Sequence, residues 1–380
     1  MSYSVPNESG SVLSDVTLIN DSMFISSGGT AVNTVVDDYA QMDVYSGGSA
    51  MQTALTGYDA RINVYSGGLA DGVTGTDSYN ALIVYDGGTV KNAVLDNYGR
   101  VYVYAGGVIS GLELLTAYGS CYGEISGLVM NNVNAWMNVY EGGKLTDAVV
   151  NAGTLIVSNG GQVSGMTINN GTVDIAGGTA TAVTVCSGGS LGADQATMGN
   201  VLVSGGWLGV YSGTSLDGLE ITDNIDYETW YGSTGRVTVA GGTVDHASMT
   251  GNGYMALLSS GTVANNTVLN RTDELRSSYG GDLHISSGAV ANNTTIGDNY
   301  SVRVWSGGSA SAVTVLSGGF LDVGSVGGAY LTGAEISSGG WCRFSSGTTA
   351  TDLVIHKGKI PWTEEPGRLQ SMGSLRIGHD

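Results

Sequence analysis

The chain has 380 residues, including 63 Gly, 3 Pro and 13 Lys or Arg against 33 Asp or Glu, which gives a formal net charge of −20. This charge excludes nucleic acid as an expected partner, because phosphates attract clusters of Lys and Arg. A collagen-like fibre is also excluded, because the glycines come without proline and without a period of three residues. No apolar stretch is long enough to predict a membrane-spanning helix.

The first residues carry no repeat. Residues 1–12 (MSYSVPNESGSV) lack the basic start and the apolar stretch of a signal peptide. For any export we therefore expect either a signal that is absent from this sequence or another export route.

A Gly-Gly pair preceded by a short apolar run then recurs along the chain. The first five copies are MFISSGG ending at Gly29, MDVYSGG at Gly48, INVYSGG at Gly68, LIVYDGG at Gly88 and VYVYAGG at Gly107. Later copies end at Gly143, Gly161, Gly189, Gly308 and Gly319. Half-length steps of 11 residues also occur between glycine pairs, such as Gly178 to Gly189 and Gly308 to Gly319. A period near 20 residues is typical of stacked repeat proteins.

Apolar residues alternate with polar ones before each glycine pair. Met42 and Val44 share one face of an expected strand, as do Ile62 and Val64, and intervening residues such as Asp43 would point outward. A second, weaker strand follows the glycines, for example SAMQTAL after Gly48. One such unit cannot bury its own apolar face, but stacked copies can. The sequence therefore predicts an all-β fold, a β-solenoid (β-helix) of about 18–20 coils over residues 1–356, at ~19 residues per coil.

The repeated pattern is apolar-x-Val-x-Ser-Gly-Gly-x-Ala-x-x-Thr-x-Val. It is carried by ISSGGTAVNTVV (25–36), VYSGGSAMQTAL (44–55), VWSGGSASAVTV (304–315) and SSGTTATDLVI (345–355). It resembles the passenger repeats of AIDA-type bacterial autotransporter adhesins, and the resemblance covers nearly all of residues 10–356. The resemblance implies a secreted or surface-exposed β-solenoid that mediates adhesion or self-association, and some members of that family carry sugars on Ser and Thr.

Tyrosines occupy two rows in the repeats. One row stands directly before the glycine turn, at Tyr45, Tyr65, Tyr85, Tyr104 and Tyr140. The other precedes the next strand, at Tyr39, Tyr58, Tyr79, Tyr98 and Tyr118. Equivalent positions of a stacked solenoid lie above one another, so each row predicts a surface ladder. Such a ladder either binds sugars or a partner rod or only stabilises adjacent coils, as cross-strand aromatic pairs do.

The most irregular insertion lies at residues 221–235 (ITDNIDYETWYGSTG). It gathers acidic and aromatic residues, namely Asp223, Asp226, Tyr227, Glu228, Trp230 and Tyr231. Because function collects on loops held by a rigid scaffold, this is the candidate ligand loop. The alternative is a simple interruption of the coil.

Composition changes at Lys357. Residues 357–380 (KGKIPWTEEPGRLQSMGSLRIGHD) hold two of the three prolines and no Gly-Gly pair. The segment from Ile360 to Asp380 resembles the translated product of a short interspersed element of ruminant genomes, which implies a chimeric reading frame and an artefactual tail. The alternatives are a polar cap on the solenoid or a linker. In each case we expect a non-repeat tail that is disordered or poorly packed.

Residues typical of catalysis or metal binding are sparse. Cys121, Cys186 and Cys342 have no Cys-x-x-Cys spacing, so we expect free thiols, and no two histidines lie at ligand spacing. Close carboxylate pairs such as Asp37 and Asp38 are not accompanied by a basic cluster. We therefore expect no cofactor, no metal and no enzyme activity.

The predicted function is that of a structural or adhesive surface region. Its expected partners are other copies of itself, as rods side by side, or glycans and proteins of a cell surface. Two alternatives remain open, a polysaccharide-active β-helix enzyme and a passive spacer. An enzyme would show one non-repetitive cleft where acidic and basic groups converge, whereas an adhesin would show a long regular face.

Overall fold

The computed structural model describes residues 2–5, 11–224, 232–270, 280–324, 328–356 and 373–377. Over these residues the chain is all-β and contains no helix, and it forms a parallel β-solenoid of about 17 turns. The predicted fold class is therefore confirmed. The chain divides into two compact units, Met1–Thr181 (unit 1) and Ala182–Asp380 (unit 2).

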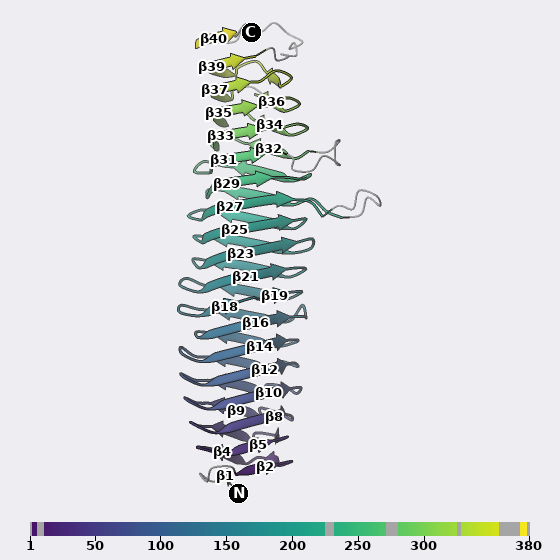
Figure 1. Cartoon of the computed structure of the whole chain (residues 1–380), viewed down its shortest axis with the longest axis vertical. Helices are drawn as coiled ribbons and strands as arrows, with labels where there is room; N and C mark the ends of the chain where they lie inside the picture. The colour runs from purple at the N-terminus through teal and green to yellow at the C-terminus, as the bar shows by residue number, and fades with distance from the viewer. Residues whose placement is uncertain are drawn as a thin grey trace. The chain divides into compact units, whose positions relative to one another are not determined.

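Each turn of unit 1 contributes strands to two sheets (Figure 1). Sheet I of unit 1 contains β1 (Ser2–Val5), β4 (Ser22–Ile25), β7 (Gln41–Val44), β9 (Arg61–Val64), β11 (Ala81–Val84), β13 (Arg100–Val103), β15 (Tyr118–Cys121), β17 (Trp136–Val139), β20 (Thr154–Val157) and β22 (Thr172–Ala176). Sheet II of unit 1 contains β2 (Val12–Ser14), β3 (Thr17–Ile19), β5 (Thr30–Val32), β6 (Val35–Asp37), β8 (Ser49–Leu55), β10 (Leu69–Gly75), β12 (Thr89–Leu95), β14 (Val108–Leu114), β16 (Glu124–Met130), β18 (Lys144–Thr146), β19 (Val149–Val150) and β21 (Gln162–Ile168).

Unit 2 repeats this arrangement. Its sheet I contains β24 (Ser190–Asp194), β26 (Trp207–Tyr211), β28 (Arg236–Ala240), β30 (Tyr254–Leu258), β32 (Asp282–Ile285), β34 (Ser301–Val304), β36 (Phe320–Val323) and β38 (Trp341–Phe344). Its sheet II contains β25 (Thr197–Ser204), β27 (Ser215–Thr222), β29 (Thr243–Met249), β31 (Val263–Leu269), β33 (Val290–Ile296), β35 (Ser309–Val315), β37 (Tyr330–Ile336), β39 (Thr349–Ile355) and β40 (Gly373–Ile377). Strand β23 (Thr179–Cys186) includes the boundary between the units.

Neighbouring turns pair in parallel and in register. Met42 lies opposite Ile62, and Ile62 lies opposite Leu82. All three side chains are fully buried. Each apolar position of the repeat therefore forms a continuous column inside its unit, and this is why single copies need their neighbours to bury their apolar faces.

The seven-residue strands of sheet II in unit 1 bend at their fourth residue. In β8 that residue is Gln52, and in β12 it is Asn92, with φ angles of 56° and 52° in the left-handed region. The bend interrupts the alternation, so that the second, fifth and seventh residues of β8 face the core: Ala50, Thr53 and Leu55. Asn tolerates this backbone conformation better than most residues do. Sequence periodicity alone predicted a plain strand here.

The glycine pairs form the corners where the chain passes from sheet I to sheet II in the first repeats. Gly67 has a φ of 72°, and a Cβ on Gly68 would lie 2.4 Å from the carbonyl oxygen of Val44 in the previous turn. The first glycine therefore supplies the left-handed turn and the second permits close stacking. In later turns pairs also occupy the opposite corner, as at Gly188 and Gly189 between β23 and β24. Half-length steps in the sequence are steps from one corner to the other.

Two residues expected to point into solvent are buried instead. Asp43 is 3% exposed and Asn63 is 5% exposed, although both lie on the outer face of sheet I. Asn63 donates a hydrogen bond to Asp43 over 2.7 Å, and Gln41 donates to both Asp43 oxygens over 2.9 Å. Neighbouring side chains cover this face, so alternation predicts the direction of a side chain better than its exposure.

One strand is described in the tail. β40 pairs in parallel with β39, with Leu353 opposite Leu375 and Ile355 opposite Ile377. Residues 357–372 and 378–380 lie outside the described residues. The expectation that residues 357–380 form a disordered or poorly packed tail remains a prediction.

Candidate functional site

Six tyrosines of unit 1 stack at the corner that leads from sheet I to sheet II. Each directly follows the last residue of a sheet I strand: Tyr45, Tyr65, Tyr85, Tyr104, Tyr122 and Tyr140. Successive ring centroids are 4.6–6.4 Å apart, and the ring planes differ by 2–13°. We call this set the first ladder. Offset stacking at such distances is favourable for aromatic rings.

Tyr122 was missed by the sequence analysis. The copy around it reads CYGE and lacks the second glycine on which the repeats were aligned. Tyr122 directly follows the strand Tyr118–Cys121, which pairs in register with β13 and β17. This position in the repeat identifies it as a member of the ladder. Aligning on strands rather than on glycines would have found it.

Three hydroxyl groups of the first ladder, those of Tyr45, Tyr65 and Tyr122, have raised pKa values. Burial raises the pKa of Tyr65 to about 12, with further contributions from the negative charge of Asp43 and from Tyr85. Burial and Asp43 also raise the pKa of Tyr45. The hydroxyls of Tyr45, Tyr65 and Tyr122 are therefore neutral near pH 7, which suits contact with another surface.

A second ladder lies at the opposite corner of unit 1. It comprises Tyr39, Tyr58, Tyr79, Tyr98 and Tyr118, with successive centroids 5.3–6.3 Å apart. The first two pairs are tilted by 52° and 60°, and the last two are stacked. Every ring of this set is 38–61% exposed. The second ladder is thus the larger exposed aromatic surface of the unit.

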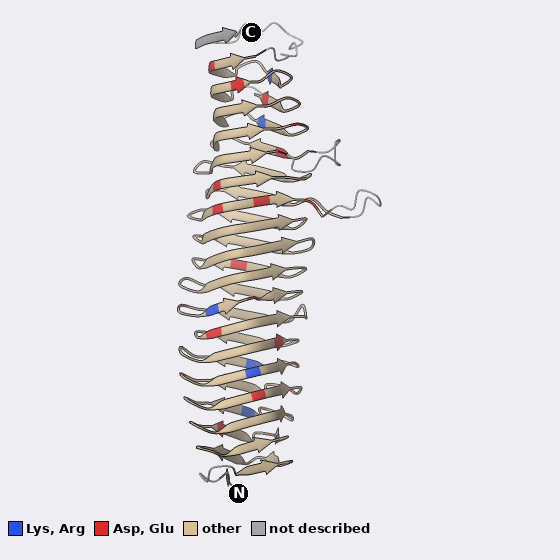
Figure 2. Ribbon diagram, in the orientation of Figure 1, with Lys and Arg blue, Asp and Glu red and all other residues tan. Residues whose placement is uncertain are grey.

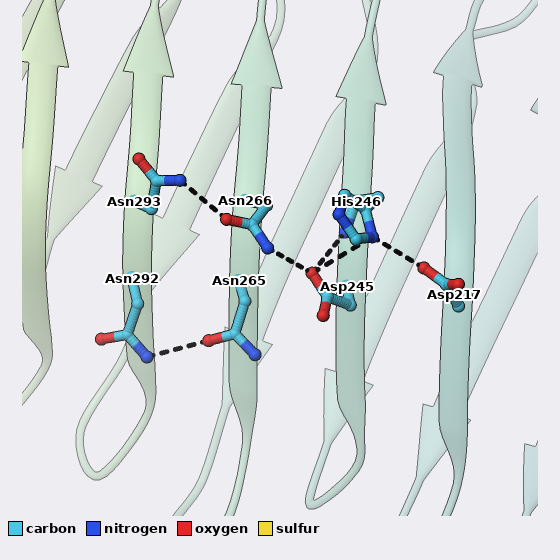
Figure 3. A network of polar contacts seen from close by, with 7 residues as sticks. All are labelled: Asp217, Asp245, His246, Asn265, Asn266, Asn292 and Asn293. Carbon is cyan, nitrogen blue, oxygen red and sulfur yellow. Dashed lines mark hydrogen bonds and ion pairs between the residues drawn. The ribbon is translucent and has the colours of Figure 1, made fainter.

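A polar network follows the bends of β27, β29, β31 and β33 in unit 2 (Figure 3). Asn293 donates to Asn266, and Asn266 donates to Asp245, each over 2.7 Å. Asn292 donates to Asn265 over 2.9 Å, and His246 Nδ1 lies 2.8 Å from Asp217. The hydrogen bond to Asp217 raises the pKa of His246. These side chains satisfy one another along the stack. The sequence alone does not connect them, because strand register is needed to place them side by side.

The candidate ligand loop is only partly described. Asp226, Tyr227, Glu228, Trp230 and Tyr231 lie outside the described residues. Asp223 is 6% exposed and accepts a hydrogen bond from the backbone N–H of Asn252 over 2.6 Å. Its described role is therefore to fasten the next turn of the solenoid.

The base of this insertion is tied to the corners beside it. Asp223 and Thr234 form an isolated antiparallel bridge. The Ser233 hydroxyl lies 2.8 Å from the Ser187 hydroxyl and donates to the carbonyl of Gly205 over 2.7 Å. These contacts border a depression of about 620 Å³, lined by Trp207, Arg236, Ser190, Ser233, Thr234 and glycines of two adjacent corners.

The cysteines and the potential metal-binding side chains of the described residues form no further candidate site. Cys121, Cys186 and Cys342 are free, as expected from their spacing. Burial raises the pKa of Cys121 to about 12 and that of Cys342 to about 11. No cluster of three His, Cys, Asp or Glu side chains suited to a metal occurs among the described residues. Nor do those residues include a helix able to cross a membrane.

Comparison with known proteins gives similarity to solved structures. No protein-family model matches the chain, and no curated protein matches it significantly. One similar structure is a fragment of TibA, residues 55–350, solved in a form hyper-glycosylated by TibC. TibA is an AIDA-type autotransporter adhesin. Its fragment is 26% identical in sequence to this chain, with a TM-score of 0.50. That match covers 86% of this chain and 98% of the TibA fragment.

Weaker similarities involve other β-helical proteins. The alginate lyase AlyF-OU02 is 12% identical with a TM-score of 0.24, covering 97% of this chain and 83% of the lyase. The receptor-binding domain of the siphovirus 9NA tailspike is 10% identical with a TM-score of 0.21, covering 100% of this chain and 77% of that domain.

One expectation is corrected by these comparisons. We expected no enzyme activity, but two of the similar structures are alginate lyases, AlyF-OU02 and one from Paenibacillus sp.. The absence of enzyme activity is therefore no longer inferred for this chain.

Proposed function

We propose that the chain is the adhesive repeat region of a secreted or cell-surface bacterial protein, and that it associates with other copies of itself through the second ladder. The observation that carries this proposal is the unbroken row of exposed rings from Tyr39 to Tyr118 on a rigid parallel solenoid. Exposed aromatic patches are typical of protein interaction sites. The similarity to the TibA fragment supports the same class of function.

A row of equivalent residues suits association between copies. Tyr58, Tyr79 and Tyr98 repeat at equivalent positions of successive turns, so a second ladder can pair with its own copy ring by ring. Such self-complementary contact is the geometry of a two-fold dimer. The charge of the chain opposes association, and Lys and Arg are few on its ribbons (Figure 2). Added salt should therefore strengthen the contact by screening the repulsion.

Sedimentation velocity on the full chain tests the proposal. We expect concentration-dependent dimers whose population rises with salt. The triple variant Tyr58→Ser, Tyr79→Ser, Tyr98→Ser should weaken dimerisation by at least about tenfold, as expected for loss of aromatic anchors. Tyr330→Ser is the matched control, since Tyr330 is 54% exposed in unit 2 and outside the ladder.

Attachment to cells is measured in parallel. Beads coated with the full chain should cluster and should bind bacterial cells, and the triple variant should do so less. A chain that stays monomeric at all concentrations and whose beads neither cluster nor bind cells would contradict the proposal.

A further inference from the structure

A single aromatic platform lies at the depression in unit 2. Trp207 and Tyr211 begin and end β26, and both point to the outer face of sheet I. Gly209 lies between them, and a Cβ there would be 2.5 Å from Cη2 of Trp207 and 2.7 Å from Oη of Tyr211. Both rings therefore lean over the bare backbone of Gly209. The absence of a side chain at this position lets the indole lie along the sheet instead of standing on it.

A free cation lies beside this platform. Trp207 is opposite Arg236 in the register of β26 and β28, so the two side chains occupy adjacent rungs, about 4.8 Å apart. Arg236 is exposed, and within the described part of the chain its side chain makes no hydrogen bond or ion pair. Other arginines on sheet I of unit 2 are neutralised, since Arg303 lies 3.6 Å from Asp282 and Arg343 pairs with Asp322.

The rest of the depression is polar and open. Ser190, Ser233 and Thr234 line it together with glycines at residues 188–189, 205–206 and 232, which add no side chains. Its volume of about 620 Å³ falls in the range of pockets for small molecules. An aromatic floor, one guanidinium and several hydroxyls are therefore gathered in one place.

This combination matches one ligand chemistry. The C–H face of a pyranose ring is apolar and packs on an indole, while its hydroxyls reach polar groups at the edge. A guanidinium binds a carboxylate through two parallel hydrogen bonds. In a chain of net charge −20, an unpaired arginine beside a half-buried indole selects a sugar that brings its own negative charge.

We propose that the depression at Trp207 and Arg236 binds an acidic saccharide, with a pyranose ring on Trp207 and the sugar carboxylate on Arg236. The site rests on the proposed function, because it names a ligand class for the same adhesive region. It involves only described residues, and its register on sheet I fixes the spacing of the two anchors.

Isothermal titration calorimetry on the full chain tests the site. The probe is an oligogalacturonate trisaccharide, and its fully methyl-esterified form has the same rings without the charge. The acid form should bind. Arg236→Gln should weaken its affinity by about tenfold or more, as expected for loss of a charge-assisted pair. The ester should bind more weakly than the acid and should be insensitive to Arg236→Gln. Trp207→Ala should weaken the binding of both the acid and the ester.

Unit 1 offers matched controls. Trp136 and Arg100 are the first residues of β17 and β13, as Trp207 and Arg236 are of β26 and β28. Trp136→Ala and Arg100→Gln should leave binding unchanged, and circular dichroism should show all four variants folded. Gly209→Ser is a further variant, since its side chain would displace the indole without removing it, and we expect weaker binding.

The outcomes separate this site from the proposed function. No binding of the acid, equal binding of acid and ester, or equal loss in the unit 1 controls would each overturn the site. If the chain dimerises and binds cells but ignores the trisaccharide, the site is wrong and the adhesive role stands. If it binds the trisaccharide through Trp207 and Arg236 without dimerising or binding cells, the site stands and the adhesive role is wrong.

Discussion

Two threonines of unit 2 occupy a core position that a valine fills in the next turn. Thr267 lies opposite Thr294, and Thr294 lies opposite Val313. Thr267 and Thr294 are 2% and 1% exposed, and the hydroxyl of each is buried without a hydrogen-bond partner. A buried hydroxyl that makes no hydrogen bond lowers stability.

Thr267→Val and Thr294→Val should therefore each stabilise the protein, by about 1 kcal/mol, since they remove an unsatisfied hydroxyl at nearly constant volume. The urea midpoint measured by circular dichroism should rise. Thr262→Val is the control, because the fully buried Thr262 hydroxyl accepts from Gly241 N–H over 2.7 Å and donates to the Leu258 carbonyl over 2.5 Å. That variant should lower the midpoint. A fall for Thr267→Val would contradict the prediction.

At the residue scale, the sequence predicted the direction in which a side chain points better than it predicted which neighbouring side chains cover it. Met42 and Val44 are buried as alternation predicted, but Asp43 between them is buried as well. Its cover comes from Gln41 and from Asn63 in the next turn. A single copy of the repeat therefore contains only part of the cover of Asp43.

At the scale of the element, the first ladder joins strands that are otherwise held by backbone hydrogen bonds and the core. Tyr85 stacks on Tyr65 at 4.7 Å and on Tyr104 at 5.2 Å. Each aromatic pair contributes about 0.5–1.5 kcal/mol beyond burial of area. The ladder therefore adds a cohesive column outside the core.

Tyr85→Ala should lower stability by about 1–3 kcal/mol, because it breaks two stacked pairs. A double-mutant cycle with Tyr65→Ala should show a coupling of about 0.5–1.5 kcal/mol. Tyr330→Ala is the control, since no ring contact of Tyr330 occurs within the described residues. A coupling near zero in denaturant titrations would show that the rings are neighbours without mutual stabilisation.

Element boundaries divided into those that the sequence could predict and those that it could not. The strand before each glycine pair followed from alternation, and the corner followed from the pair itself. The bend at Gln52 did not follow from the sequence, because Gln gives no signal for a left-handed backbone conformation. The depression at Trp207 could not be predicted either, since Arg236 lies one rung away in space but beyond the insertion at residues 221–235 in sequence.

At the scale of the whole molecule, the turn is the unit of length within each unit. Gln41 lies opposite Arg61, and Arg61 lies opposite Ala81. Residues 61–80 therefore make one complete turn, with one strand in each sheet. Every column of the core passes through the turn at an equivalent position.

Deletion of residues 61–80 should leave a folded protein, because Gln41 can then pair with Ala81 and Tyr45 can stack on Tyr85. Circular dichroism should keep its strand spectrum, and limited proteolysis should keep its pattern elsewhere. Deletion of residues 61–70 is the control. It removes half a turn and places core residues on the wrong face, so we expect loss of protection. Equal damage from both deletions would contradict the turn as the unit of length.

The in-register stacking of equivalent turns also has a genetic consequence. Recombination between two repeats of the coding sequence adds or removes whole turns when the crossover joins equivalent positions, such as those encoding Gly48 and Gly68. Each event changes the number of rungs without altering a corner, a core column or a tyrosine row. Variants with more or fewer turns can thus arise in one step and still fold. Selection can then act on the length of the solenoid.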